Sequence, residues 1–254
     1  MKPAACAIEA LPAGHEPRAV DTLVRAFAED PAINNLFPDA PGRRARLAHV
    51  FGIELRYGLR YGRVDRVPAD AAVAIWARPE HTWPTWWRLI RAGILATPLV
   101  LGFRAAWRTL RFQHFLESTR RRLLKSPHWY LIAIGVRPGQ QGRGLGAALL
   151  RHGVERAQAT GFPCYLETAN ARNLPFYEQH GFRVVGERRL PRGGPAIWGL
   201  VAGLVRRFPL VSRKPDRFGS PPSADENARK TAETSRLQIA PVSGALKSLS
   251  ETTG

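Results

Sequence analysis

Apolar positions along the chain follow two periods, which predicts a mixed α/β fold. Val20, Leu23, Val24 and Phe27 recur at the spacing of one helical face, whereas other short runs of β-branched and aromatic residues are typical of strands. The pattern predicts helices over residues 16–30, 43–60, 147–160 and 174–180. It predicts strands over residues 5–11, 63–67, 72–77, 129–136, 163–168, 184–190 and 196–201.

A proline sets the end of the first predicted helix. Asp30 precedes Pro31, and we expect the first helix to end there because a residue before proline avoids the α region. Residues 31–42 hold three prolines and two asparagines and are predicted to be a loop. The helix that follows is expected to bury one apolar face, formed by Leu47, Phe51, Leu55 and Leu59.

Residues 84–125 combine a high apolar density with flanking arginines. The uncharged run from Ala92 to Phe103 is interrupted by Pro98 and has about half the length of a membrane span, so no stable membrane insertion is expected. Three interpretations remain open: helices packed on the sheet, an amphipathic element at a membrane surface, or a roof over the substrate. Four tryptophans are candidates to wall an apolar pocket: Trp83, Trp86, Trp87 and Trp107.

The apolar pattern fades near the C-terminus, where Ser, Pro, Lys, Glu and Thr dominate. We therefore expect one domain over residues 1–205, followed by a basic tail over residues 206–254 that is disordered because it has no core of its own.

The formal net charge is +18, but its distribution argues against nucleic acid as the main partner. The basic residues are mostly arginine, spread from Arg18 to Arg236 without a zinc-finger, helix-turn-helix or RNA-binding motif. A positive field also suits an enzyme that binds a polyanionic cofactor.

Cysteine usage indicates a reducing compartment. Cys6 and Cys164 are the two cysteines and lie far apart, so no disulfide framework is implied. Glu9 and Pro12 interrupt the apolar stretch at the N-terminus, and we expect no secretory signal there and a cytoplasmic protein.

A glycine-rich turn is the first candidate for chemistry. Gly142, Gly144 and Gly146 separate the strand over 129–136 from the next helix. Glycines let the backbone approach an anion, and a helix N-terminus directs free N–H groups and its dipole toward it. Neither a Gly-Lys-Ser/Thr phosphate loop nor the third glycine of a dinucleotide motif is present. The turn therefore predicts an anion site of another type.

At this point the sequence resembles the GNAT acetyltransferase superfamily. Gln141-x-x-Gly144-x-Gly146 matches its Q/R-x-x-G-x-G/A signature, and LETANARNLPFYEQHGFRVV matches its downstream segment, with Asn170 seven residues before Tyr177. The resemblance is strong over residues 128–200 and looser over 5–127, with the nearest likeness to puromycin N-acetyltransferase-like proteins.

The resemblance implies a GNAT fold: a mixed, mostly antiparallel sheet flanked by helices, with two strands that splay to form a slot for acetyl-CoA. It also implies how the donor is held. Ile134, Gly135 and Val136 would offer backbone groups to the pantetheine arm, and Asn170 or Asn173 would contact that arm. The pyrophosphate would be held by Gln141, Gly142, Arg143, Gly144, Leu145, Gly146 and Ala147.

The resemblance further assigns Tyr177 as the general acid that returns a proton to the departing thiolate, a role that suits a phenol protonated at neutral pH. Glu167 is the carboxylate expected as general base, with His128 or an ordered water as alternatives. Cys164 lies mid-strand among apolar neighbours and is expected to be core. No His/Cys spacing predicts a metal site.

The expected activity is transfer of an acetyl group from acetyl-CoA to a primary amine, by direct attack on the thioester. A small-molecule amine is favoured. The alternatives are a protein N-terminus or lysine as acceptor, and a non-catalytic acyl-CoA-binding module. The chain would act as a monomer or homodimer.

Overall fold

The computed structural model describes residues 7–38, 42–191 and 193–203 and contains one seven-stranded sheet. Its strand order is β1-β2-β3-β4-β5-β7-β6, and every neighbouring pair is antiparallel except β4 with β5. The strands are β1 (Glu9–Ala10), β2 (Gly62–Arg66), β3 (Ala72–Ala77), β4 (Trp129–Val136), β5 (Cys164–Thr168), β6 (Arg183–Arg189) and β7 (Ala196–Ala202). The predicted mixed, mostly antiparallel sheet flanked by helices is confirmed.

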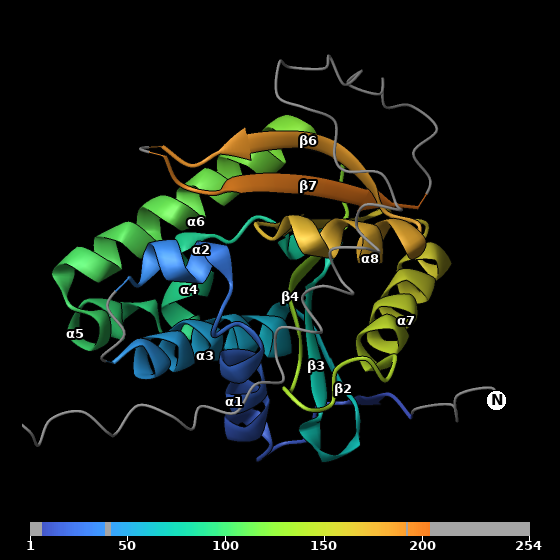
Figure 1. Cartoon of the computed structure of the whole chain (residues 1–254), viewed down its shortest axis with the longest axis horizontal. Coiled ribbons are helices and arrows are strands. Elements are labelled where there is room, and N and C mark those ends of the chain that lie inside the picture. Colours follow the sequence, from blue (N-terminus) through green and yellow to red (C-terminus); the bar gives the residue numbers. More distant parts are fainter. Residues whose placement is uncertain (1–6, 39–41, 192, 204–254) are drawn as a thin grey trace, which may run out of the picture. The chain divides into compact units, whose positions relative to one another are not determined.

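Eight α-helices accompany the sheet in the described residues (Figure 1). They are α1 (Glu16–Ala26), α2 (Pro31–Leu36), α3 (Arg43–Tyr61), α4 (Trp86–Ala92), α5 (Thr97–Leu101), α6 (Phe103–Leu123), α7 (Leu145–Ala159) and α8 (Leu174–Gln179). Short 3-10 turns lie at Pro68–Asp70, Pro79–His81, Ile94–Ala96 and Ala171–Asn173.

The two faces of the sheet carry different helices, because strand side chains alternate between faces. Val73 and Ile75 of β3 pack in one core cluster with buried residues of α1, α2, α3 and α6. Ala74 and Trp76 point the other way and pack with α7 and α8. Figure 1 shows α1 and α3 on one side of β3 and β4, and α7 on the other.

The stretch predicted to be a loop after the first helix contains a helix instead. Asp30 accepts hydrogen bonds from the N–H groups of Ala32 and Ile33, and Pro31 occupies the first turn. An Asp-Pro pair is a helix start signal as well as a stop signal, because proline lacks only an N–H that the first turn leaves unpaired. The preceding helix α1 ends earlier, at Ala26.

Most other predicted elements are confirmed within a few residues, with one error in the core. Leu59, expected on the buried face of α3, is 41% exposed, whereas Leu47 and Leu55 are buried. The segment over 84–125 is helical, as α4 to α6. None of the described helices is long and apolar enough to span a membrane. The predicted tail, over residues 206–254, and Cys6 lie outside the described residues.

Candidate active site

The parallel strands β4 and β5 separate at the centre of the sheet. They pair only through Trp129 to Leu131, opposite Cys164 to Leu166. Beyond this point β4 continues to Val136 and β5 to Thr168 without pairing with each other. On its other edge β4 has a register shift against β3, between Ile75 and Trp76. The unpaired edges leave backbone groups available to a ligand between the strands.

The turn after β4 presents backbone donors to solvent. In the described part of the chain, the N–H groups of residues 141–147 donate no hydrogen bond, and the last three of them begin α7. Gly142 and Gly144 have φ values of 76° and 78°, and no atom lies within 4 Å of where a Cβ would stand. This left-handed backbone strongly favours glycine, and the open space fits an anion at the helix N-terminus. The turn therefore fits an anionic group, and its role in binding the pyrophosphate of coenzyme A stays a prediction.

Side chains around the turn hold its shape. The Gln141 amide donates to the Val136 carbonyl at 3.3 Å, and the Arg143 guanidinium donates to the Gln140 side chain at 2.9 Å. Leu145, Gly146 and Ala147 form the first turn of α7, and a Cβ on Gly146 would meet Val136 at 3.3 Å.

The strand residues predicted to face the pantetheine arm differ from one another. Ile134 lines the cavity described below. Gly135 is buried, and a Cβ there would come within 2.9 Å of Ala26, so its small size serves the packing of α1 on β4. Its backbone remains next to the gap between β4 and β5.

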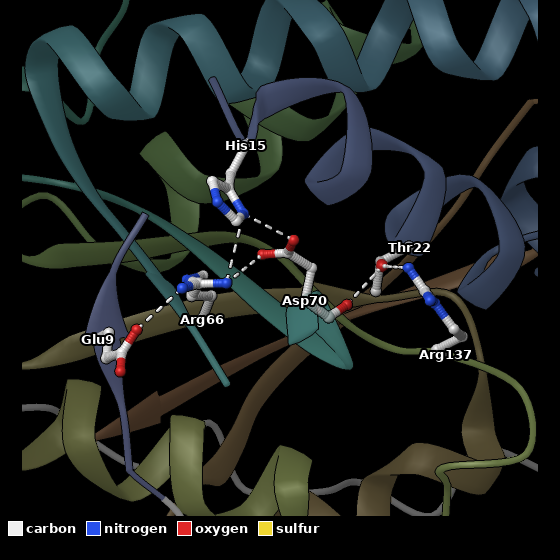
Figure 2. A network of polar contacts seen from close by, with 6 residues as sticks. All are labelled: Glu9, His15, Thr22, Arg66, Asp70 and Arg137. Carbon is white, nitrogen blue, oxygen red and sulfur yellow. Dashed lines mark hydrogen bonds and ion pairs between the residues drawn. The ribbon is translucent and has the colours of Figure 1, made fainter. Parts of the chain in front are cut away.

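A polar network anchors the base of the turn (Figure 2). Arg137, the first residue after β4, donates to the hydroxyl of Thr22 at 3.0 Å, and that hydroxyl donates to the Asp70 carbonyl at 2.6 Å. The Asp70 carboxylate is fully buried and pairs with Arg66 and His15, each at 2.9 Å. Burial raises the pKa of Asp70, but the hydrogen bonds from His15 and Arg66 outweigh it and lower the pKa overall.

The two predicted asparagines lie between β5 and α8. The Asn170 side chain accepts from the Arg172 N–H at 3.1 Å and so caps the 3-10 turn, while Asn173 lines the cavity. Asn173 is thus the better placed of the two to meet a ligand in the cavity.

Tyr177 lies on α8, is 7% exposed and lines the same cavity. Its ring packs against those of Phe176 and Phe182. Burial raises the pKa of Tyr177 and the charge of Asp30 raises it further. The phenol therefore stays protonated at neutral pH and can act as a proton donor.

Glu167, at the end of β5, is buried in a hydrogen-bonded cluster. Tyr130 donates to Oε2 at 2.9 Å and Tyr165 donates to Oε1 at 3.1 Å. The Arg120 guanidinium lies 3.6 Å from Oε2 and stacks over the Tyr130 ring at 4.0 Å. Burial raises the pKa of Glu167, opposed by Arg120 and the two phenols. Both carboxylate oxygens are already engaged.

A cavity of about 470 Å³ joins these groups, a volume typical of small-molecule sites. Its lining comes from α2, α3, α4, α6, the separated ends of β4 and β5, and α8, and is mainly apolar. Four carboxyl side chains line it: Asp30, Glu54, Glu117 and Glu167. Arg120 is the one arginine in the lining among the described residues. Such a site favours a ligand with an apolar body and a polar group that can hydrogen-bond to a carboxyl side chain.

Comparisons with known proteins show a similarity to one acetyltransferase family. Residues 100–182 match the Acetyltransferase (GNAT) family. An uncharacterised N-acetyltransferase of Schizosaccharomyces pombe is 27% identical over 171 residues, which is 65% of this chain and 69% of that protein. These similarities relate residues 100–182 of the chain to the GNAT acetyltransferases.

A solved structure supports the fold. A Corynebacterium glutamicum protein described as histone acetyltransferase HPA2 and related acetyltransferase matches with a TM-score of 0.53 and 23% identity. The match covers 76% of this chain and 93% of that one. It supports the GNAT architecture, and the closer likeness to puromycin N-acetyltransferase-like proteins stays a prediction.

One cavity residue, Glu54 of α3, is not among the site residues that the sequence predicted. It is half-buried, lines the cavity, and has its pKa raised to about 8 by burial, opposed by its interaction with the Gln113 amide. The sequence contains a signal for this residue. Glu54 lies between Phe51 and Leu55, so it interrupts an apolar face that was predicted to be buried.

Two other residues considered for catalysis lie outside the cavity lining. His128 is fully buried, its Nδ1 lies 2.7 Å from the Ser126 carbonyl, and burial lowers its pKa to about 4. Cys164 is buried, and burial raises the pKa of its thiol to about 12. A thiol with that pKa is not nucleophilic at neutral pH, in accord with a core position.

Proposed function

We propose that the chain acetylates a primary amine on a small molecule with an apolar body, with acetyl-CoA as donor. The observation that carries this proposal is the cavity, which joins the gap between β4 and β5 to a chamber with apolar walls and four carboxyl groups. Apolar walls bind the body of an acceptor, and a carboxyl side chain can accept a hydrogen bond from its amine.

The free N–H groups of the turn support a proposal for the donor side. The N–H groups of residues 141–147 would hold the pyrophosphate, and the Arg143 guanidinium in the same turn would add positive charge. The exposed edges of β4 and β5, with Ile134 and Asn173, would hold the pantetheine arm in hydrogen-bonding reach. When bound, the thioester supplies the acetyl group.

Tyr177 is proposed as the general acid. It lies on α8, which follows β5, and its raised pKa keeps the proton available for the thiolate that leaves. Buried aromatic neighbours fix the position of the ring.

Glu54 is proposed as the group that accepts the proton of the amine, in place of Glu167. A base is most effective when its pKa lies near the working pH, and Glu54 has a pKa of about 8 at the cavity wall. Glu167 is held by Tyr130, Tyr165 and Arg120. Glu167 is therefore better suited to hold these three side chains in position than to accept a proton from the amine.

The proposal is tested by measuring release of the coenzyme A thiol with a panel of acceptors. The panel contains small primary amines with aromatic or alkyl bodies, and peptides with free N-termini or lysines. Turnover of small amines alone supports the proposal. Turnover of peptides alone would establish the protein-acetyltransferase alternative. Tight coenzyme A binding without turnover of any acceptor would leave a non-catalytic binding module.

The role of Tyr177 is tested in the same assay with Tyr177→Phe. We expect kcat to fall about 10²–10⁴-fold, the usual contribution of general acid–base catalysis, with the affinity for coenzyme A unchanged. Tyr61→Phe is the matched control, since Tyr61 of α3 packs against Tyr57 and His81 outside the cavity lining. Equal rates for Tyr177→Phe and the control would exclude Tyr177 as the acid.

A further inference from the structure

The helices from α4 to the start of α6 expose an unusual number of apolar side chains. Of the nine large apolar side chains that are exposed in the described residues, eight lie between Trp86 and Leu110. Trp87 is 74% exposed, Leu99 89% and Phe103 84%. Concentrations of exposed apolar surface mark interaction sites in soluble proteins. We call the exposed face of residues 86–111 the basic apolar surface.

Positive charge accompanies the apolar side chains. Residues 81–116 contain no aspartate or glutamate, whereas Arg88, Arg91, Arg104, Arg108 and Arg111 all fall within 86–111. All of these arginines except Arg88 are exposed, and none of those four makes a salt bridge within the described residues. The surface therefore carries uncompensated positive charge.

On α6 the two kinds of side chain form parallel stripes. Phe103, Trp107 and Leu110 follow the spacing of one helical face, and Arg104, Arg108 and Arg111 follow the same spacing one residue later. All six are exposed, while Ala105, Ala106 and Thr109 face the core. A helix with an apolar stripe beside a basic one is typical of elements that lie in the interface of an anionic membrane.

We propose that the basic apolar surface docks on an anionic lipid surface. Tryptophan and phenylalanine would enter the headgroup region, and the arginines would pair with lipid phosphates. A second copy of the chain fits less well, because an isologous contact brings the same surface together twice and would oppose arginines with no acid in the segment to pair them. Two residues of the surface, Trp86 and Leu110, also line the cavity. The cavity thus borders the face that would contact lipid.

The test is co-sedimentation of the full chain with vesicles. We expect binding to vesicles of equal parts phosphatidylcholine and phosphatidylglycerol, little binding to phosphatidylcholine alone, and weaker binding as salt is raised. Phe103→Ser/Trp107→Ser should weaken binding about tenfold or more, because both rings leave the headgroup region. Arg104→Gln/Arg108→Gln/Arg111→Gln should weaken it about fivefold per arginine, on the order of a hundredfold in all.

A matched variant separates this surface from the general charge of +18. Arg18→Gln/Arg78→Gln/Arg183→Gln removes the same charge from exposed positions elsewhere in the chain, and it should bind almost as well as wild type. Circular dichroism and thermal unfolding check that every variant is folded.

Three results would overturn the proposal. The first is no binding to the mixed vesicles, or equal losses in the two arginine variants. The second is a dimer in sedimentation velocity without lipid that Phe103→Ser/Trp107→Ser dissociates, which would make the surface a contact between copies. The third is binding to polyglutamate but not to vesicles, which would indicate an acidic protein partner.

Discussion

The turn over residues 141–147, proposed to hold the donor and called the donor turn below, and the cavity proposed to hold the acceptor are built in opposite ways. The turn offers backbone N–H groups from one short segment, residues 141–147. Gly142 and Gly144 leave open space where a side chain would stand. The cavity uses side chains that lie far apart in sequence, from Asp30 to Tyr177, on several helices and two strands. The pyrophosphate of coenzyme A is the same for every acceptor, so backbone groups alone could hold it. The acceptor would instead be selected by the side chains of the cavity.

The difference predicts how each region responds to mutation. Backbone donors are lost only when the backbone changes conformation, so substitutions in the turn should act through φ and ψ. Cavity side chains carry charge and protons, so substitutions there should change pH dependence and acceptor choice. Three predictions test this contrast.

The largest effect is expected at the network below the turn, where side chains support the backbone (Figure 2). Asp70→Asn should lower the free energy of unfolding by about 3–5 kcal/mol, because it leaves Arg66 without its buried partner. Asparagine tolerates the left-handed backbone of Asp70, whose φ is 53°, so charge is the main change. Chemical denaturation measures the loss.

Asp21→Asn is the control for a surface charge. Asp21 is partly exposed and pairs with Arg25 and Arg44, so its loss should cost less than about 1 kcal/mol. The pKa of Asp70 is lowered on folding, so its contribution is present above the ordinary pKa of 3.8 and is lost as pH falls through the folded value. Asp70→Asn keeps the backbone carbonyl that accepts from Thr22, so the link to Arg137 remains and coenzyme A affinity should be unchanged where the variant is folded. A parallel loss of affinity would show that the donor turn depends on side chains after all.

The second prediction concerns Glu54. With an acceptor that is neutral over the whole range, kcat/KM of the wild type should rise as pH rises through about 8, where Glu54 loses its proton. Glu54→Gln should remove this limb and lower the plateau about a hundredfold. Glu167→Gln is the comparison. If its profile loses the limb while Glu54→Gln keeps it, the base is Glu167.

Glu54 also links stability to pH. Its pKa is about 8 in the folded chain against an ordinary 4.5, so the folded state holds the proton more tightly. The resulting stability is fully present below about 4.5, declines as pH rises toward 8, and is constant above that value. Glu54→Gln should flatten this dependence in denaturant titrations at several pH values. If the free energy of unfolding changes with pH equally in Glu54→Gln and the wild type, folding does not raise the pKa of Glu54.

The sequence predicted these two regions unequally, for a physical reason. Gly142, Gly144 and Gly146 are contiguous and require a backbone that few other residues adopt, so the motif could be found without the fold. The cavity role of Glu54 and the contacts of Glu167 with Arg120 depend on how α3 and α6 pack against the sheet. No periodicity within one segment contains that information.

The same holds for the fold itself. The strands with strong β-branched patterns, such as β4 over Trp129–Val136, were predicted to the residue. A loop was predicted in place of α2, because Asp30-Pro31 can end a helix. In the structure the Asp30 side chain instead caps the start of α2. Leu59 continues a four-residue spacing, but an α-helix has 3.6 residues per turn, so Leu59 turns away from the sheet while Gly58 faces Ile75 and Val64. Local pattern predicts the element, and tertiary packing decides which of its faces is buried.

The smallest expected effect isolates the backbone of the donor turn by comparing two glycines. Gly144 and Gly161 have φ values of 78° and 74°, and no atom lies within 4 Å of a Cβ at either site. Gly144→Ala and Gly161→Ala should therefore destabilise the fold equally, by about 1–2 kcal/mol, the cost of a left-handed alanine. Only Gly144→Ala should weaken coenzyme A binding, by about tenfold, because relaxing its backbone misaligns N–H groups that would bond a charged phosphate. Calorimetry on both variants measures the affinity. Equal affinities would mean that the phosphates are held by side chains such as Arg143, and the contrast between backbone and side-chain recognition would then fail on the donor side.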